Sequence, residues 1–333
     1  MADERARPAL PDADRVELGY WLSSEEHTPR TLVRNAVAAE DAGFRHAMVS
    51  DHHAPWTPAQ GESGFVWSVL GAIAVSTDEL RVGTGVSAAL HRMHPVVLAQ
   101  AAATVATLMP GRFFLGLGSG ERLNEHMTGR HWPAGKERRR MLRDTVEVVR
   151  DLLDGASVTR DRAHFRAERA RIHTRPDTPP PIVVAAGGSR TARIAGELAD
   201  GLIGVTPSSE LVEAYAFSGG SGPRLAQLHV CWAETEAEAL ATAAHWWPNG
   251  LVPERVLGEL ALPGDIAAVA GAIDDARIAD TVVCGPDPQR IVDAIHRYVA
   301  SGFTTVYLHQ VGPDQHGFLE LATGELLPRF AAP

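Results

Sequence analysis

Short apolar runs alternate with longer amphipathic segments along the chain, and glycine, proline or small polar residues separate them. The apolar runs have the length of buried β-strands, and the longer segments have the apolar spacing of helices. The expected strands are residues 16–22, 44–50, 80–86, 112–118, 181–188, 200–205, 224–233 and 304–311. The expected helices are residues 28–43, 65–76, 95–109, 136–153, 189–199, 235–247 and 317–330, the first of them capped by Ser23 or Ser24.

Eight strands that alternate with helices indicate parallel crossovers, and the sequence therefore predicts an α/β fold, a (β/α)8 TIM barrel. We expect a polar leader at residues 1–15 and one barrel domain at residues 16–333, with insertion segments at about 155–178 and 248–280. The part at residues 160–175 has the composition of a solvated hairpin. The alternative is a doubly wound open sheet, for which the Gly-rich segment at residues 116–121 is only a weak dinucleotide signal.

The composition excludes several classes of protein. With 333 residues and 45% hydrophobic content the chain can bury a large core, while a net charge of −10 offers no footprint for nucleic acid. No apolar run approaches the roughly 18 residues of a membrane helix, and the polar start resembles no signal peptide. Cys231 and Cys284 lie in apolar runs without other metal ligands nearby. We expect a cytoplasmic protein with buried thiols, no metal, and no nucleic-acid or membrane partner.

The segment VSDHHAPW, from Val49 to Trp56, follows the second expected strand and has no helical or strand periodicity. Taken alone, an Asp-His pair at a strand end is as often a cap beside a satisfied surface histidine as a functional pair. In a TIM barrel, however, the residues after each strand share one rim. Asp51, His52 and Trp56 should therefore lie beside the polar ends of the neighbouring strands.

Glycines recur at these strand ends. For any single glycine a tight turn is the better interpretation, but four glycine-rich ends on one rim favour room for a flat ligand and free backbone N–H groups. The glycines concerned are Gly85, Gly118, Gly120, Gly187 and Gly188.

Glu121 and Asn124 follow the fourth strand. In a closed, partly apolar pocket the proton affinity of Glu121 would be raised, which suits a proton donor. The alternative is an ordinary acid at a helix start. Asn124 could hold a ring carbonyl or cap a turn.

The segments VSDHHAPW, GTGV, GLGSGERLNEH, AAGG and YLHQVGPDQHGFLEL resemble the luciferase-like flavin and deazaflavin oxidoreductases, from about Val16 to Phe330. The resemblance is to the branch of glucose-6-phosphate dehydrogenases that use coenzyme F420. It implies a luciferase-like TIM barrel, a homodimer, and a deazaflavin that lies across the barrel mouth.

The resemblance also implies roles for individual residues. His52 would be the base on the substrate hydroxyl, Trp56 would stabilise the charged intermediate, and Glu121 would give a proton to N1 of the ring. Asp51 and Asn124 would hold the ring system. The remaining cofactor contacts would be a strand-three bulge with a cis peptide after Gly85, comprising Gly85, Val86 and Ser87, and a site for the ribityl-phosphate tail at Ala185, Ala186, Gly187 and Gly188.

The chain departs from that branch where basic side chains grip the substrate phosphate. Ser208, Leu257 and Thr281 occupy the matching positions, and their side chains would leave a phosphate unpaired. We therefore expect a small substrate without phosphate: a sugar, an alcohol or a carbonyl compound.

The sequence thus predicts an F420-dependent dehydrogenase or reductase that transfers a hydride at C5 of the deazaflavin. Because His52 must be neutral to accept a proton, activity in the oxidative direction should fall on acidification. Two alternatives remain open at this stage: an FMN-dependent monooxygenase on the same scaffold, and a catalytically silent flavin-binding barrel.

Overall fold

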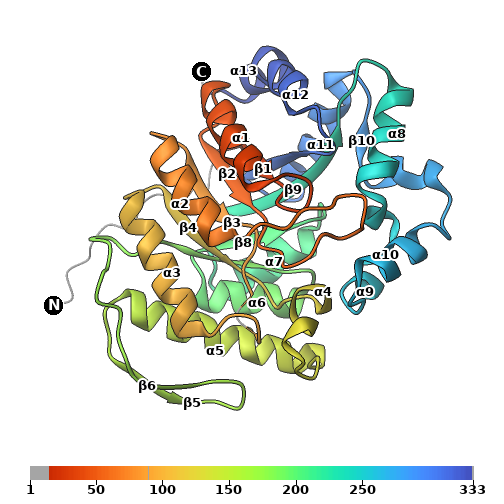
Figure 1. Cartoon of the computed structure of the whole chain (residues 1–333). Helices are drawn as coiled ribbons and strands as arrows, with labels where there is room; N and C mark the ends of the chain where they lie inside the picture. The colour runs from red at the N-terminus through yellow and green to blue at the C-terminus, as the bar shows by residue number, and fades with distance from the viewer. Residues whose placement is uncertain (1–14, 89, 332–333) are drawn as a thin grey trace.

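Eight parallel strands form a closed barrel in a computed structural model that describes residues 15–88 and 90–331 (Figure 1). The expected polar leader lies outside the described residues, apart from Arg15. β9 bonds to both β8 and β11, and β11 bonds to β1, so the sheet closes and the open-sheet alternative is wrong. In barrel order the strands are β1 (Glu17–Leu22), β2 (His46–Val49), β3 (Arg81–Thr84), β4 (Phe113–Leu117), β7 (Ile182–Ala185), β8 (Gly201–Gly204), β9 (Arg224–Cys231) and β11 (Thr305–Gln310).

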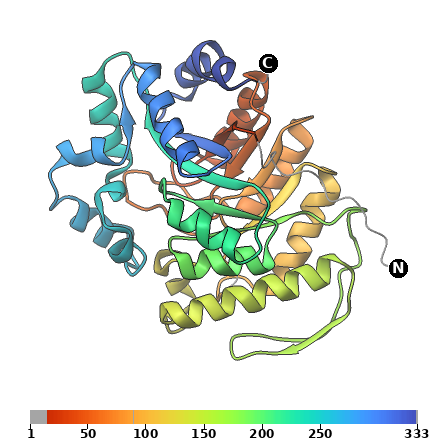
Figure 2. The same ribbon diagram turned by 180° about the vertical axis from the view of Figure 1, so that it is seen from behind.

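Helices surround the barrel, as the two opposite views show (Figures 1 and 2). The expected strands and the main helices agree with the structure to within a few residues. The last expected helix is built from three contiguous parts, the middle one a π-helical turn. The outer helices are α1 (Pro29–Asp41), α2 (Val66–Ser76), α3 (Pro95–Leu108), α5 (Gly135–Leu153), α6 (Ser189–Leu198), α7 (Ser209–Phe217), α11 (Pro288–Ala300), α12 (Gln315–Leu321), η4 (Ala322–Leu326) and α13 (Leu327–Phe330). No helix in residues 15–88 and 90–331 is long and apolar enough to cross a membrane.

The expected cap of the first helix is wrong. Thr28 is the N-cap of α1, and its side chain accepts a hydrogen bond from the N–H of Thr31 at 3.2 Å. Pro29 follows at the first helical position, where its missing N–H costs nothing. Ser24 instead bonds to Ser50, so the segment between β1 and α1 is an ordered loop at the barrel mouth.

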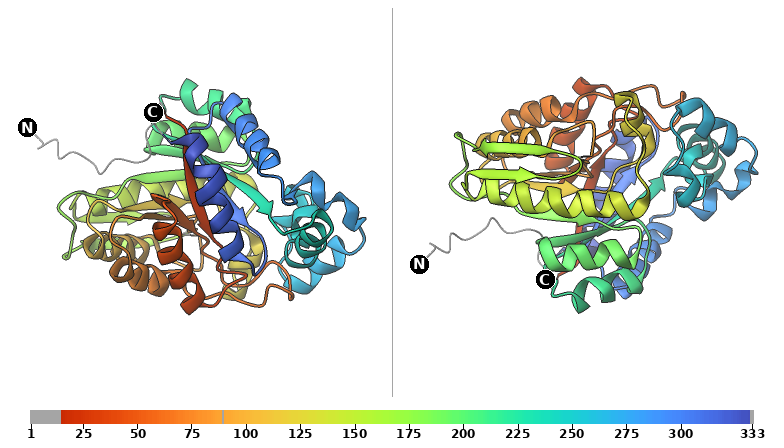
Figure 3. Two further views of the ribbon diagram at one scale, coloured as in Figure 1. Left: turned by 90° about the horizontal axis from the view of Figure 1, so that it is seen from above. Right: turned by 90° about the horizontal axis from the view of Figure 1, so that it is seen from below.

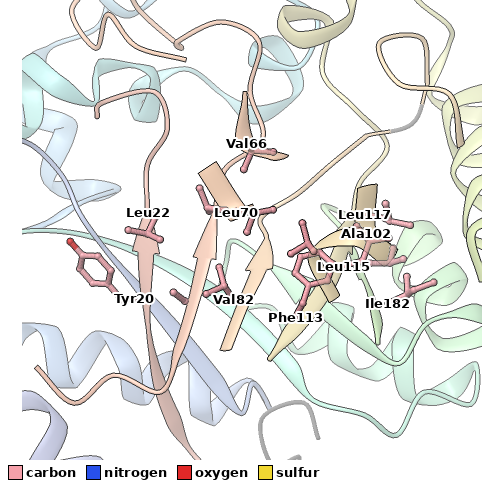
Figure 4. Packing of buried hydrophobic residues seen from close by; sticks show 14 of the residues in the cluster. Tyr20, Leu22, Val66, Leu70, Val82, Ala102, Phe113, Leu115, Leu117 and Ile182 are labelled. Atoms are coloured by element: carbon pink, nitrogen blue, oxygen red, sulfur yellow. The ribbon is translucent and has the colours of Figure 1, made fainter. Parts of the chain in front are cut away.

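Alternating side chains of the strands fill two separate layers. Outward-facing residues such as Leu22, Val82 and Leu115 pack against the helices in the main core, which Figure 4 shows from close by. Inward-facing residues fill the barrel itself, so the barrel is a packed core whose polar chemistry is confined to its mouth. The inner layer consists of Trp21, Met48, Phe114, Val183, Ile203, Leu225 and Tyr307.

Two segments lie outside the repeated β/α units. The first is the hairpin that its composition predicted, formed by antiparallel β5 (Val158–Asp161) and β6 (Arg166–Ala170). It lies along α5 (Figure 3). The second is a lobe that projects from one side of the barrel and has an apolar cluster of its own (Figure 3). The lobe comprises α8 (Glu236–Trp246), η2 (Pro248–Leu251), α9 (Glu254–Leu257), α10 (Pro263–Ala270), η3 (Asp275–Asp280) and β10 (Val283–Cys284).

Candidate active site

Three side chains from different strand ends meet at the barrel mouth. Glu25 follows β1, His52 follows β2 and Glu121 follows β4. Nε2 of His52 lies 3.4 Å from Oε1 of Glu25 and 3.6 Å from Oε2 of Glu121. The expected convergence of His52 and Glu121 is therefore confirmed. The sequence also predicts that His52 and Glu121 face opposite edges of one flavin ring. Their separation of 3.6 Å is shorter than that arrangement requires.

A backbone carbonyl fixes the tautomer of His52. Nδ1 of His52 lies 3.3 Å from the carbonyl oxygen of Ala54, and a carbonyl can only accept, so Nδ1 carries the hydrogen. In the neutral ring the lone pair is then on Nε2, the atom that faces the two carboxyl groups. His52 is thus oriented to take a proton at Nε2.

Glu25 is held by serine hydroxyls and is nearly fully buried. Its Oε2 accepts hydrogen bonds from Ser50 and, at 3.1 Å, from Ser23. Burial acts to raise the pKa of Glu25, but His52 and the Ser50 hydrogen bond outweigh it, and the net pKa is below the usual value. Glu25 is therefore ionised at neutral pH and stabilises a positive charge on His52.

Glu121 has the opposite character. Its side chain is 38% exposed at the mouth and accepts a hydrogen bond from Nδ2 of Asn124 at 3.2 Å. Burial raises the pKa of Glu121; His52 opposes this and the charge of Glu25 adds to it. The two carboxyl groups beside His52 thus differ in proton affinity. This difference suits Glu121 to act as an acid and Glu25 to stabilise a positive charge.

Asn124 joins the loops that follow β2 and β4. Its Oδ1 accepts the backbone N–H of His53 at 2.8 Å, while its Nδ2 binds Glu121. The amide thereby sets the separation of His52 and Glu121. Asn124 was expected either to hold a ring carbonyl or to cap a turn. In the structure its amide bonds to other residues of the protein.

Asp51 is fully buried and already paired. Arg92 Nη2 lies 2.8 Å from its Oδ1, and the Ser87 hydroxyl donates to its Oδ2 at 2.5 Å. Ser87 belongs to the bulge after β3, where the expected cis peptide between Gly85 and Val86 is confirmed. That Asp51 holds a ring system stays a prediction; in the structure its carboxylate binds Ser87 of the bulge.

Trp56 connects the site to the lobe. Its ring packs edge-on against His52 with the centroids 4.7 Å apart, and it belongs to the apolar cluster of the lobe. Gln60 secures this arrangement, because its Oε1 accepts the backbone N–H of Trp56 at 2.8 Å and its Nε2 donates to the backbone carbonyl of Trp246 at 2.9 Å. The lobe therefore holds the Trp56 ring in place beside His52.

The interpretation of the strand-end glycines needs correction. A Cβ on Gly85 would lie 2.5 Å from the Trp21 ring, and one on Gly118 would lie 2.6 Å from Val86. Their N–H groups bond to the carbonyl oxygens of Val49 and Ser87. Gly120 adopts a φ of +71°, as a turn requires, and packs against Leu90. These three glycines allow close packing of the protein itself, and the expected free donors at Gly85 and Gly118 are absent.

The end of β7 is more open. A Cβ on Gly188 would meet nothing within 4 Å, whereas one on Gly187 would lie 2.3 Å from Oε1 of Glu254 in α9. The N–H of Ala186 bonds to the Ile203 carbonyl, and Ala185 ends the strand. Gly188 therefore fits the expected place of a phosphate, with an exposed carboxylate from α9 beside it.

Three positions were expected to lack the basic side chains that bind a substrate phosphate in the related branch, and they lie in different segments of the chain. Ser208 is half-buried before α7, and Leu257 packs against the apolar cluster of the lobe. Thr281 is exposed, and its hydroxyl donates to the Ile278 carbonyl at 3.1 Å. None of the three offers a positive charge.

Sequence reasoning missed several residues of the mouth: Glu25, Glu26, Gln60, Arg92, Glu125, His229 and His309. Glu25 and Glu26 directly follow β1, so the rule that located His52 would also have found them. His229 and His309 interrupt apolar strands, which is a second signal. In residues 15–88 and 90–331 no three His, Cys, Asp or Glu side chains are grouped to hold a metal.

The fold and the site together define a TIM barrel whose mouth holds an imidazole between two carboxyl groups, one with a lowered pKa and one with a raised pKa. The chain belongs to the luciferase-like monooxygenase family, whose model matches residues 15–305. It is 36% identical over 330 residues to an F420-dependent glucose-6-phosphate dehydrogenase from Beutenbergia cavernae, covering 95% of this chain and 98% of the relative.

Further comparisons agree. The enzyme of the same name from Mycobacterium tuberculosis is 35% identical over 329 residues, covering 94% of this chain and 98% of the relative. The solved structure of an F420-dependent secondary alcohol dehydrogenase in complex with an F420–acetone adduct superposes with a TM-score of 0.88 at 23% identity, covering 96% of this chain and 100% of that chain. At that identity the likeness shows the shared fold.

Proposed function

We propose that the protein is an F420-dependent oxidoreductase that interconverts a CH–OH group and a C=O group in a small molecule. The names of the relatives support the cofactor and the reaction class. The observation that carries the proposal is the cluster of Glu25, His52 and Glu121, because an alcohol oxidation requires both a base and a group that holds a proton.

The mouth has groups suited to a deazaflavin. The open backbone at Gly188 leaves space for a phosphate, the Asn124 amide can bind a ring carbonyl, and burial raises the pKa of Glu121. Glu254 must turn away when an anion binds at the end of β7. When bound, F420 supplies a hydride acceptor at C5 and a proton acceptor at N1.

The residues of the chain divide the proton chemistry. His52 accepts the hydroxyl proton of the substrate at Nε2, and its Nδ1–H remains bonded to Ala54. The ionised Glu25 stabilises the imidazolium that results. Glu121 holds the proton destined for the ring nitrogen, and Trp56 covers one side of His52 and excludes water.

Titration with F420 and with FMN tests the cofactor. Trp56 contacts His52 at the mouth, so tryptophan fluorescence should change strongly on addition of F420 and little on addition of FMN. Stronger binding of FMN would favour the monooxygenase alternative. Binding of F420 without any turnover across alcohols, sugars and ketones would favour the silent binding protein.

We further propose a substrate without phosphate, because Ser208, Leu257 and Thr281 offer it no positive charge. The kcat/KM for glucose should equal or exceed that for glucose-6-phosphate. Introducing a cation by Thr281→Arg should raise the relative kcat/KM for the phosphate ester by about 10-fold, the effect of one charge-assisted hydrogen bond. Thr281→Gln is the matched control of similar length. A clear preference of the unmodified enzyme for the phosphate ester would contradict this proposal.

The expected homodimer also belongs to the proposal. α2 and α3 lie side by side (Figure 1) and expose apolar side chains, among them Val75 at 75% and Val97 at 53%. Sedimentation should give twice the chain mass of 35.7 kDa, and Val75→Asp should lower it. A monomer mass for the unmodified protein at micromolar concentration would contradict the dimer.

A further inference from the structure

Two histidines that the proposed reaction does not use face each other inside the barrel. His229 on β9 and His309 on β11 are partners in register, and their Nδ1 atoms lie 2.9 Å apart. Each lies an even number of residues from an inward-facing residue of its own strand, Leu225 on β9 and Tyr307 on β11. Because side chains alternate along a strand, both imidazoles point into the upper layer of the barrel.

Glu26 anchors this pair. Its Oε2 lies 2.6 Å from Nε2 of His309, and its Oε1 accepts the Gly312 N–H at 2.8 Å. The side chains of Glu26 and His309 are both fully buried. A carboxylate bound to a backbone N–H accepts from the ring, so Nε2 of His309 carries hydrogen and the two Nδ1 atoms share one further proton.

Glu26, His309 and His229 thus form a hydrogen-bonded relay, and in the described part of the chain this relay ends at one nitrogen without a partner, Nε2 of His229. Among residues 15–88 and 90–331, Nε2 of His229 has no hydrogen-bond partner, and the residue is half-buried. Since the ring points into a closed barrel, its exposed part faces the mouth. Trp247 packs on both rings, with centroids 4.8 Å from His229 and 4.5 Å from His309, and holds them in place. Burial, and secondarily His309, keep the pKa of His229 well below the usual value, so it is neutral.

The relay lies beside the proposed reacting groups. Glu25 and Glu26 are consecutive, and each binds a different histidine, His52 and His309 respectively. His309 also acts on the charge of Glu25 and contributes to its lowered pKa. A molecule whose reacting oxygen contacts His52 would thus lie at the same end of the barrel as His229.

We propose that Nε2 of His229 binds a second, non-reacting oxygen of the substrate, and that Glu26 and His309 position its ring. The inference rests on the proposed function and deepens it: the substrate class is a neutral molecule with two neighbouring oxygens, such as a vicinal diol or a hydroxy ketone. If the shared proton is on His229, Nε2 accepts from a hydroxyl. If it is on His309, that ring holds one proton more and is an imidazolium paired with Glu26, while His229 keeps its own hydrogen on Nε2 and donates it to a carbonyl. A neutral ring suits either group, and His229 brings no charge to pair with a phosphate.

The kinetic test compares propylene glycol with isopropanol, which share a carbon skeleton and differ by one hydroxyl. For the unmodified enzyme kcat/KM should be about 10-fold higher for the glycol, since the simpler alcohol has no second oxygen to pair with Nε2 of His229. His229→Leu should remove this preference mainly through the KM of the glycol, and His229→Gln should restore part of it. A preference unchanged in His229→Leu would overturn the proposal, because a purely structural histidine affects both alcohols equally.

A second measurement does not depend on turnover or on the variant's folding. In unmodified protein labelled with 15N-histidine, propylene glycol should shift the Nε2 resonance of His229, and isopropanol should not. Equal shifts or none would overturn the proposal. Loss of F420 binding in the titration above would instead reject the proposed function, so the two failures are distinguishable.

Discussion

Replacing His52 with alanine should lower kcat by about 100- to 10,000-fold, the usual contribution of a positioned base. The Kd for F420 should change by less than about threefold, since His52 acts on the substrate proton and not on the cofactor. Stopped-flow measurement of F420 reduction under single-turnover conditions separates this step from product release.

His53→Ala is the matched control for His52→Ala. The His53 side chain is exposed, and its structural contact is through the backbone N–H to Asn124, which alanine retains. This variant should keep kcat within about twofold, as surface changes usually do. Equal losses of kcat and F420 affinity in His52→Ala would show that His52 only binds.

Glu121→Gln should reduce kcat about 100-fold, because glutamine keeps the shape and the bond to Asn124 but has no proton to give. Burial raises the pKa of Glu121, so the carboxyl group holds its proton to a higher pH than a free glutamate. The rate in the oxidative direction should therefore decline as pH rises through that raised pKa, and this decline should be absent from Glu121→Gln. Pre-steady-state rates across a pH series check both expectations.

Glu320→Gln serves as the control for Glu121→Gln, since its side chain is 73% exposed on α12 and outside the site. It should leave both the rate and the pH profile unchanged. If Glu121→Gln keeps the full rate and loses F420 affinity instead, Glu121 is a binding residue and the proton has another source.

The alternation of apolar runs and amphipathic segments was sufficient to place the eight strands, because each strand of a parallel barrel is covered on both sides. The cap of α1 was predicted wrongly for a tertiary reason, although the start of the helix was predicted to within one residue. Ser24 would be a good cap by type, but in the fold it bonds to Ser50 at the end of the neighbouring strand. A local pattern does not reveal a partner 26 residues away.

The residues of the site also fall into those that the sequence could predict and those that it could not. His52 and Glu121 could be paired from sequence, because the ends of parallel strands share one rim. The role of Gly118 could not be predicted from sequence. A glycine is needed there because the Val86 side chain of the bulge leaves no room for a Cβ. The relay of Glu26, His309 and His229 joins the first, seventh and eighth strands of the barrel. Only the closure of the sheet brings them together.

The Gln60 contacts have a consequence for how such a barrel can change its specificity. The chain segment that carries His52 and Trp56 is fastened to helices inserted between the seventh and eighth strands, and not only to the strand that delivers it. Replacing that inserted lobe by another sequence would thus alter the surroundings of the mouth while His52 and Glu121 stay in the loops that follow β2 and β4. Transplanting lobes between homologous barrels, with Gln60 retained, is accordingly a direct route to enzymes with the same chemistry and different substrates.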